Sequence, residues 1–177
     1  MKNVLAEKKA LDFARKAHGT QTRKYNEELY IEHPIRVAET LREIPHTSEM
    51  ICAAYLHDVV EDTEVCLPQI KKEFGKQVAN LVSELTDEYT KEQYPELNRR
   101  WRKKKETERI ANISRDAQSI KLADIMDNLP SVSIKDPGFA KKYTKEIEAL
   151  VKVLQGGHPK LLERAQLVVE KAKKSLE

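Results

Sequence analysis

Hydrophobic residues recur along most of this chain at the three- and four-residue spacing of an amphipathic helix. Leu11, Ala14 and His18 share one face, and Gly19 follows them as a stop signal. The same pattern predicts helices near residues 11–18, 34–41, 48–62, 78–85, 120–129, 139–154 and 160–174. Alternating β-branched residues, the mark of a half-buried strand, are absent from the sequence. The predicted fold class is therefore all-α, a compact multi-helix bundle.

Several residues predict where these helices begin and end. Ser48 is a plausible N-cap, and Pro34 suits the first turn of its helix. Pro130 is expected to end the helix that begins near residue 120. Residues 87–107 are polar with few apolar anchors, which predicts a loop or a mobile helix.

Composition narrows the class of protein. With 177 residues, 34% of them charged and 40% hydrophobic, the chain is predicted to form a single soluble domain over 1–177. Its net charge of +3 suits an anionic small molecule better than it suits sequence-independent nucleic-acid binding. Cys52 and Cys66 form no Cys-x-x-Cys pair, so no zinc or redox motif is indicated. The sequence shows no signal peptide and no membrane span, and we expect a cytoplasmic protein without a membrane partner.

The most informative segment for chemistry ends the apolar run of residues 48–62. On a continuous helix His57 lies one turn before Glu61, and Asp58 lies one turn before Asp62. Three carboxylates crowded beside an imidazole repel one another unless a positive charge lies among them. A divalent cation would supply that charge, because imidazole nitrogen and carboxylate oxygen are both ordinary metal ligands. The alternative is a solvated, acidic helix end.

Two further positions could contribute to such a site. Asp124 interrupts an apolar run, with Lys121 three residues before it and Asn128 four residues after it. A lone buried aspartate is costly, so Asp124 either pairs with Lys121 or binds a metal. His33 precedes Pro34 at a helix start, where an isolated histidine most often caps or packs.

Taken in order, these motifs resemble a known family. The series includes His18 to Lys24, Tyr30-Ile-Glu-His33-Pro34, Leu56-His57-Asp58-Val-Val-Glu61-Asp62-Thr63, Phe74-Gly75, Leu85-Thr86-Asp87, Ile120 to Asp124, and Asn128-Leu129. Such a series resembles the histidine–aspartate (HD) hydrolase superfamily, and within it the small alarmone hydrolases of the RelA/SpoT type. Each motif is weak alone, and the ordered series is highly specific.

The resemblance implies a role for ten residues. One divalent ion, usually Mn²⁺ in this family although other transition metals are open, would be held by His33, His57, Asp58 and Asp124. The attacking water would be positioned or deprotonated by Glu61 and Asp62. The nucleotide substrate would be met by Arg23, Lys24, Lys121 and Asn128.

The implied reaction is removal of the 3′-pyrophosphate from guanosine tetra- and pentaphosphate. Asp127, Pro130 and the loop of residues 25–30 depart from the family pattern near the expected position of base and sugar. An adenine alarmone or the 2′-phosphate of NADPH therefore stays open as an alternative substrate. A non-catalytic nucleotide-sensing module is an alternative from another class, although Glu61 and Asp62 argue against it.

One basic run of the sequence has no role among the residues that the resemblance assigns. Residues 99–105 carry six basic side chains around Trp101, a pattern most often found on a solvated helix face. The same cations could gather a polyphosphate substrate, and nucleic-acid binding is the less favoured interpretation. The sequence leaves the oligomeric state open, a homo-oligomer included.

Overall fold

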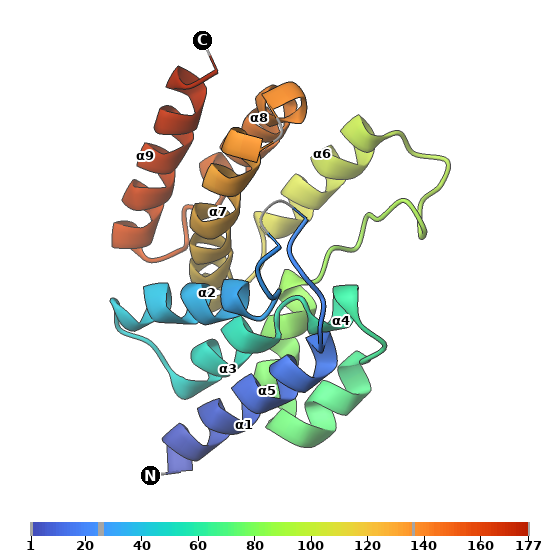
Figure 1. The fold of residues 1–177 in the computed structure, drawn as a ribbon, viewed down its shortest axis with the longest axis vertical. Helices are drawn as coiled ribbons and strands as arrows, with labels where there is room; N and C mark the ends of the chain where they lie inside the picture. The colour runs from blue at the N-terminus through green and yellow to red at the C-terminus, as the bar shows by residue number, and fades with distance from the viewer. Residues whose placement is uncertain (1, 25–26, 136, 177) are drawn as a thin grey trace. The chain divides into compact units, whose positions relative to one another are not determined.

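The computed structural model describes residues 2–24, 27–135 and 137–176 (Figure 1). Throughout those ranges the regular structure is helical, and one isolated β-bridge pairs Thr22 with Leu29. The prediction of an all-α fold is thereby confirmed. The chain divides into two compact units, one up to Thr86 and one from Asp87 onward. The single domain over 1–177 stays a prediction, and no helix in the described ranges is long and apolar enough to cross a membrane.

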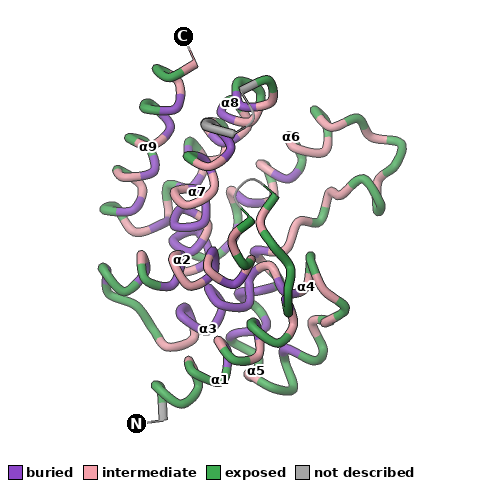
Figure 2. The backbone as a smooth tube through the Cα atoms, viewed as in Figure 1, coloured by how far each residue is buried: buried purple, intermediate pink, exposed green. Residues whose placement is uncertain are grey.

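The first unit is built around one short apolar helix. Its helices are α1 (Lys2–His18), α2 (Glu32–Arg42), α3 (Ser48–Leu56), α4 (Val59–Asp62) and α5 (Leu67–Leu85). Helix α3 packs against α1, α2 and α5, and every residue from Met50 to Leu56 is buried (Figure 2). The segment that leads into His57 is thus fixed in the core.

The single helix predicted over 48–62 is wrong, because the helix breaks at His57 and Asp58. The His57 Nδ1–H group donates to the Ala54 carbonyl at 2.8 Å, and Ala54 is the residue whose carbonyl a continuing helix would offer to the Asp58 amide. A new turn then begins, in which the Asp62 amide donates to the Asp58 carbonyl at 2.9 Å. The predicted cap is also one residue late: Thr47, not Ser48, accepts a hydrogen bond from the Met50 amide.

Helix α5 contains a backbone turn at Gly75. Gly75 has φ of 85° and ψ of 172°, in a region that residues with a Cβ rarely adopt. The predicted helix of residues 78–85 is confirmed as the part of α5 that follows this turn.

The second unit contains α6 (Arg99–Ile110), α7 (Arg115–Lys135), α8 (Pro137–Val153) and α9 (Pro159–Lys174). Helix α8 contacts the other three, and α7 also contacts α9. The loop predicted from residue 87 is found up to residue 98, after which α6 begins. In the turn before α9, a Cβ added to Gly157 would lie 2.6 Å from Leu122 Cδ1, so this glycine allows a close approach to α7.

Pro130 does not end α7, so that prediction is wrong. Proline removes one helical hydrogen bond. Leu129 and Val132 beside it are both buried. We attribute the continuation of the helix to this packing, which offsets the lost bond.

Candidate active site

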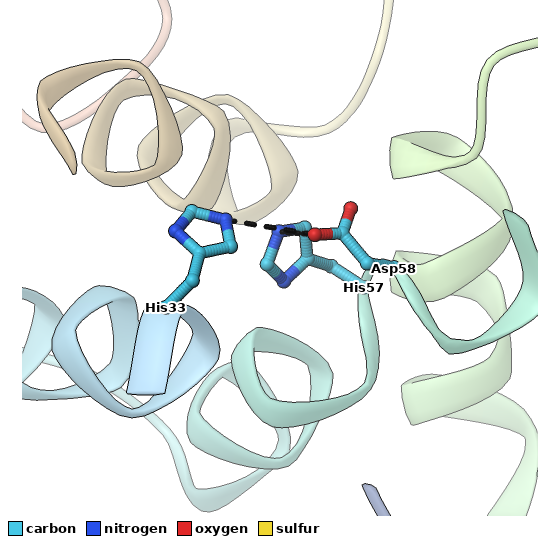
Figure 3. A group of neighbouring side chains, drawn as sticks. All are labelled: His33, His57 and Asp58. Carbon is cyan, nitrogen blue, oxygen red and sulfur yellow. Dashed lines mark ion pairs between the residues drawn. The ribbon is translucent and has the colours of Figure 1, made fainter. Parts of the chain in front are cut away.

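Three of the four predicted metal ligands meet in the first unit. Asp58 Oδ2 lies 3.1 Å from His57 Nε2 and 3.5 Å from His33 Nε2 (Figure 3). One ligand atom from each residue lies within 4.8 Å of the others, close enough to share one ion. Both histidines are buried, and the Asp58 side chain is 19% exposed. His33 comes from α2, while His57 and Asp58 form the junction between α3 and α4.

The hydrogen bond at His57 orients that ring for coordination. The Ala54 carbonyl can only accept, so His57 Nδ1 carries a proton. In a neutral imidazole Nε2 then presents a lone pair, and it faces a carboxylate oxygen at 3.1 Å. Two electron-rich atoms at this distance need a proton or a cation between them. The cluster is therefore either an imidazolium–carboxylate pair or a metal centre, and its donors fit a divalent transition metal.

Tyr30 fixes the carboxylate of Asp58. Its hydroxyl donates to Asp58 Oδ2 at 2.7 Å, the same oxygen that faces both histidines. Its ring stacks on His18 at a centroid distance of 4.7 Å. Burial, together with the negative charges of Asp58 and Asp62, raises the pKa of Tyr30. The hydroxyl thus stays protonated and remains a donor.

Gln21 extends this support to the next carboxylate. Its side-chain oxygen lies 2.8 Å from His18 Nδ1, and its amide nitrogen donates to the Asp62 carbonyl at 2.8 Å. Because a carbonyl can only accept, the nitrogen of the Gln21 amide must face Asp62, and its oxygen must face His18. His18 Nδ1 is therefore the donor of that hydrogen bond. Sequence reasoning missed the roles of Tyr30 and Gln21. Tyr30 stands one turn before His33, a spacing that could have drawn attention to it.

Glu61 and Asp62 lie on the single turn of α4, and both residues are exposed. Loss of hydration around the Asp62 carboxyl raises its pKa, and so does the nearby negative charge of Asp58. The hydrogen bond from Tyr30 acts in the opposite direction and lowers the pKa. The net shift is upward, which brings this group nearer to the range in which a carboxylate exchanges protons at neutral pH.

Arg23 and Lys24 lie on the loop between α1 and α2. The Arg23 amide donates to the Glu28 carbonyl at 2.8 Å, next to the bridge formed by Thr22 and Leu29. The Arg23 side chain is half-buried and Lys24 is exposed. Residues 25 and 26 of the 25–30 loop lie outside the described residues, so its departure from the family pattern is only partly visible.

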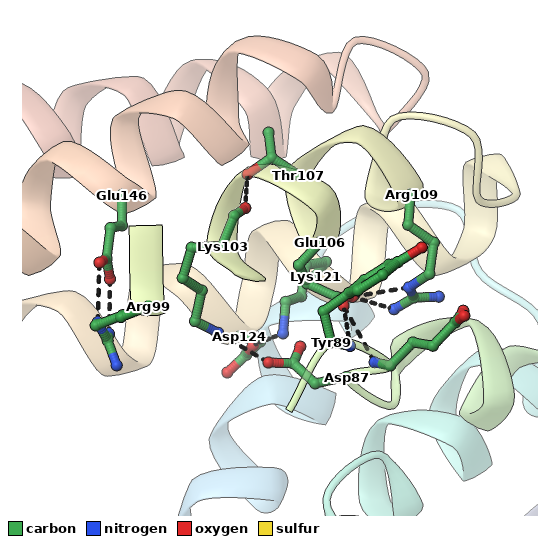
Figure 4. A network of polar contacts seen from close by, with 11 residues as sticks. Asp87, Tyr89, Arg99, Lys103, Glu106, Thr107, Arg109, Lys121, Asp124 and Glu146 are labelled. Carbon is green, nitrogen blue, oxygen red and sulfur yellow. Dashed lines mark hydrogen bonds and ion pairs between the residues drawn. The ribbon is translucent and has the colours of Figure 1, made fainter. Parts of the chain in front are cut away.

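Asp124, the fourth predicted ligand, lies on α7 in the second unit and is 6% exposed. Its Oδ2 is 3.0 Å from Lys121 Nζ, and its Oδ1 accepts a hydrogen bond from the Asn128 side chain. The pairing with Lys121 that the sequence left open is therefore present (Figure 4). A role for Asp124 in metal binding stays a prediction.

A neighbouring acidic group, Asp87, was not singled out by sequence reasoning as a functional residue. Lys103 Nζ lies 2.8 Å from its Oδ2 (Figure 4). Burial alone would raise the pKa of Asp87, but the positive charges of Lys121 and Lys103 hold it below its ordinary value. Asp87 thus connects the start of the 87–98 loop electrostatically to α6 and α7.

Comparisons with known proteins indicate the family of this chain. A family model described as HD domain matches residues 10–154. The guanosine-3′,5′-bis(diphosphate) 3′-pyrophosphohydrolase MESH1 of Mus musculus is 36% identical over 91% of this chain and 91% of its own length. A probable guanosine-3′,5′-bis(diphosphate) 3′-pyrophosphohydrolase of Mycoplasma pneumoniae is 33% identical over 90% of this chain, which spans 23% of that protein.

A solved structure supports the same assignment. The chain superposes on a metazoan ortholog of SpoT that hydrolyses ppGpp with a TM-score of 0.82 and 29% identity, over 97% of both chains. The match to the family model and the near full-length similarity to MESH1 show the family directly. The chain belongs to the HD domain family, and within it to the small hydrolases similar to MESH1.

Proposed function

We propose that this protein hydrolyses guanosine 3′,5′-bis(diphosphate), releasing its 3′-pyrophosphate with the help of one divalent ion. The observation that carries the proposal is the convergence of His33, His57 and Asp58 on one point, within a chain of this family. The names of the similar proteins support the choice of substrate.

The proposed ion is Mn²⁺, held by His33, His57 and Asp58 together with Asp124. Two imidazole nitrogens and carboxylate oxygens suit this class of ion. The tautomer of His57 and the distance of 3.1 Å between its Nε2 and Asp58 Oδ2 support coordination at this point. When bound, the ion would supply a Lewis acid that polarises a phosphoryl oxygen.

Glu61 and Asp62 are the proposed proton acceptors. Water attacks the phosphorus atom attached to the 3′ oxygen, and one of these carboxylates takes the proton that the water loses. The bond between the 3′ oxygen and that phosphorus breaks, and the protonated carboxylate returns its proton to the 3′ oxygen. Pyrophosphate is released and a 3′-hydroxyl forms on the guanosine nucleotide. The upward shift of the Asp62 pKa favours its role as a proton acceptor.

Four other residues are proposed to bind the substrate. Arg23 and Lys24 would neutralise phosphate oxygens, and a guanidinium can also stack on a base. Lys121 and Asn128 border Asp124 on α7, and they would approach the substrate from that helix.

A nucleotide panel tests the proposal. The chain is purified, loaded with Mn²⁺ and incubated separately with guanosine tetraphosphate, an adenine alarmone and NADPH, and the products are identified. Pyrophosphate and GDP from guanosine tetraphosphate are expected. Release of orthophosphate from NADPH, with no turnover of the other nucleotides, would identify NADPH as the substrate instead. No turnover of any nucleotide would favour the sensing module.

Asp58→Ala should remove both turnover and tight Mn²⁺ binding. Asp12→Ala is the matched control, because Asp12 is an exposed aspartate on α1. Full activity of Asp58→Ala would contradict the assigned centre. A cytoplasmic location remains a prediction from the sequence, which leaves the oligomeric state open.

A further inference from the structure

An open groove lies between α6 and α8 in the second unit. Its volume is about 740 Å³, and α6 lines it with Arg100, Lys103, Lys104, Thr107 and Glu108, while α8 contributes Lys142, Lys145, Glu146 and Ala149. Five of these nine residues are basic and two are acidic. The basic run noted in the sequence therefore faces further cations from another helix, about 40 residues along the chain. A basic helix face that is merely solvated would not need to lie opposite a second one.

Of the five cations, Lys103 pairs with Asp87, which does not line the groove, and the acidic residues of the groove neutralise little of the remaining charge. Glu146 makes a two-point contact with Arg99, at 2.9 and 2.7 Å, and Arg99 is not one of the lining residues (Figure 4). Glu108 lies 3.9 Å from Lys104 on an exposed surface, where an ion pair contributes little. Arg100, Lys142 and Lys145 are exposed, and their side chains make no ion pair or hydrogen bond with the residues that the structure describes.

The positive charges are arranged in rows. Arg100 and Lys104 are four residues apart on α6, and Lys142 and Lys145 are three apart on α8. Each row therefore advances by about one helical turn, roughly 5 Å, from one cation to the next. A single phosphate group is bound by cations that converge on one point, whereas rows of cations match a chain of phosphates.

An exposed aromatic ring lies beside one of the lysines that line the groove. Trp101 is 51% exposed, and the Lys104 ammonium lies 5.2 Å from its ring centroid. An exposed indole beside a line of cations is the combination with which proteins bind single-stranded nucleic acid: the cations follow the backbone and a base stacks on the ring. We propose that the α6–α8 groove binds single-stranded nucleic acid, with Arg100, Lys142 and Lys145 contacting phosphates and Trp101 stacking on a base.

Fluorescence anisotropy with a fluorescein-labelled 20-nucleotide oligouridylate tests the proposal. The whole chain is titrated into the probe at several salt concentrations. The groove variant carries Arg100→Gln, Lys142→Gln and Lys145→Gln. The matched control carries Lys71→Gln, Lys72→Gln and Lys76→Gln, which removes the same charge from exposed lysines of α5.

The groove variant should weaken binding strongly and lower the slope of log affinity against log salt by about 2, at about 0.7 for each lost phosphate contact. The control should keep the slope of the unchanged protein. Trp101→Ala should weaken binding at least about 5-fold, the lower limit for loss of one stacked base.

Three outcomes would overturn the proposal. The first is no binding tighter than about 10 µM at low salt, where non-specific nucleic-acid binding is normally measurable. The second is equal weakening by the groove variant and its control. The third is complete displacement of the RNA by tripolyphosphate at the same total phosphate concentration, together with unchanged binding by Trp101→Ala, since that pattern identifies a phosphate site without a role for bases.

Discussion

Removing the hydroxyl of Tyr30 isolates one hydrogen bond at the proposed metal centre. In Tyr30→Phe the ring can keep its stacking on His18 and its edge contact with His33. The change removes the donor that lies 2.7 Å from Asp58 Oδ2. Asp58 then loses the group that holds its oxygen toward the two histidines.

The expected magnitude follows from that single bond. A hydrogen bond to a charged group contributes about 1.5–3 kcal/mol. Loss of such a supporting partner typically lowers metal affinity about 10- to 100-fold. Each tenfold step is about 1.4 kcal/mol, so the two ranges agree. We therefore expect Mn²⁺ affinity to fall within that range. The metal-free protein should also lose stability, because the same hydrogen bond is present without the ion.

Two measurements check this expectation. Isothermal titration with Mn²⁺ gives the affinity directly. Thermal unfolding with and without Mn²⁺ gives the stabilisation by the ion, which grows with the logarithm of its concentration over its dissociation constant. Tyr94→Phe is the control, because Tyr94 is a half-buried tyrosine of the second unit whose ring contacts Tyr89. Equal Mn²⁺ affinity in all three proteins would refute the idea that Tyr30 orients a metal ligand.

Three further predictions follow from the same structure. Glu61→Gln should keep Mn²⁺ affinity and slow turnover by about 100-fold or more, as expected for loss of a general base; a full rate in steady-state assays would show that another group takes the proton. Asp87→Asn should cost about 1–3 kcal/mol at pH 7 by removing the charged partner of Lys103. Because the pKa of Asp87 is lowered on folding, this stabilisation is present above about pH 4 and disappears as the pH falls through the folded-state pKa, so the thermal unfolding curves of variant and parent should converge in acid. Gly157→Ala should cost about 1–3 kcal/mol in chemical denaturation, since its Cβ would lie 2.6 Å from Leu122 Cδ1; an unchanged midpoint would show that α7 moves to make room.

The helical pattern of the chain was predictable because it depends on local spacing. Periodicity found the apolar faces of the helices. The break at His57 was not predictable from periodicity, since it depends on a side chain that bonds a backbone carbonyl. The continuation of α7 through Pro130 depends on tertiary packing, which local propensity does not include.

The candidate site also combines features that the sequence predicted with features that only tertiary contacts reveal. The meeting of His33 with the His57–Asp58 pair came from the ordered motifs, and no spacing rule could derive it. The roles of Tyr30 and Gln21 were missed although both residues lie in the quoted motifs, because aromatic and amide side chains have many structural uses. Only their hydrogen bonds reveal the present one. The groove between α6 and α8 forms where the faces of two separate helices approach each other. The sequence therefore showed only the basic run on α6 and not the cations that α8 adds to the same groove.

The junction between α3 and α4 carries a further consequence. Aspartate is among the best residues for the first position of a helix, where its carboxylate usually accepts an amide hydrogen bond worth about 1 kcal/mol. Asp58 holds that position in α4 but makes no such bond, because its carboxylate is turned toward Tyr30 and the histidines. Directed evolution that rewarded heat resistance alone would therefore gain nothing from the capping ability of this aspartate. Selection that retains catalysis must accept a weak point at the junction.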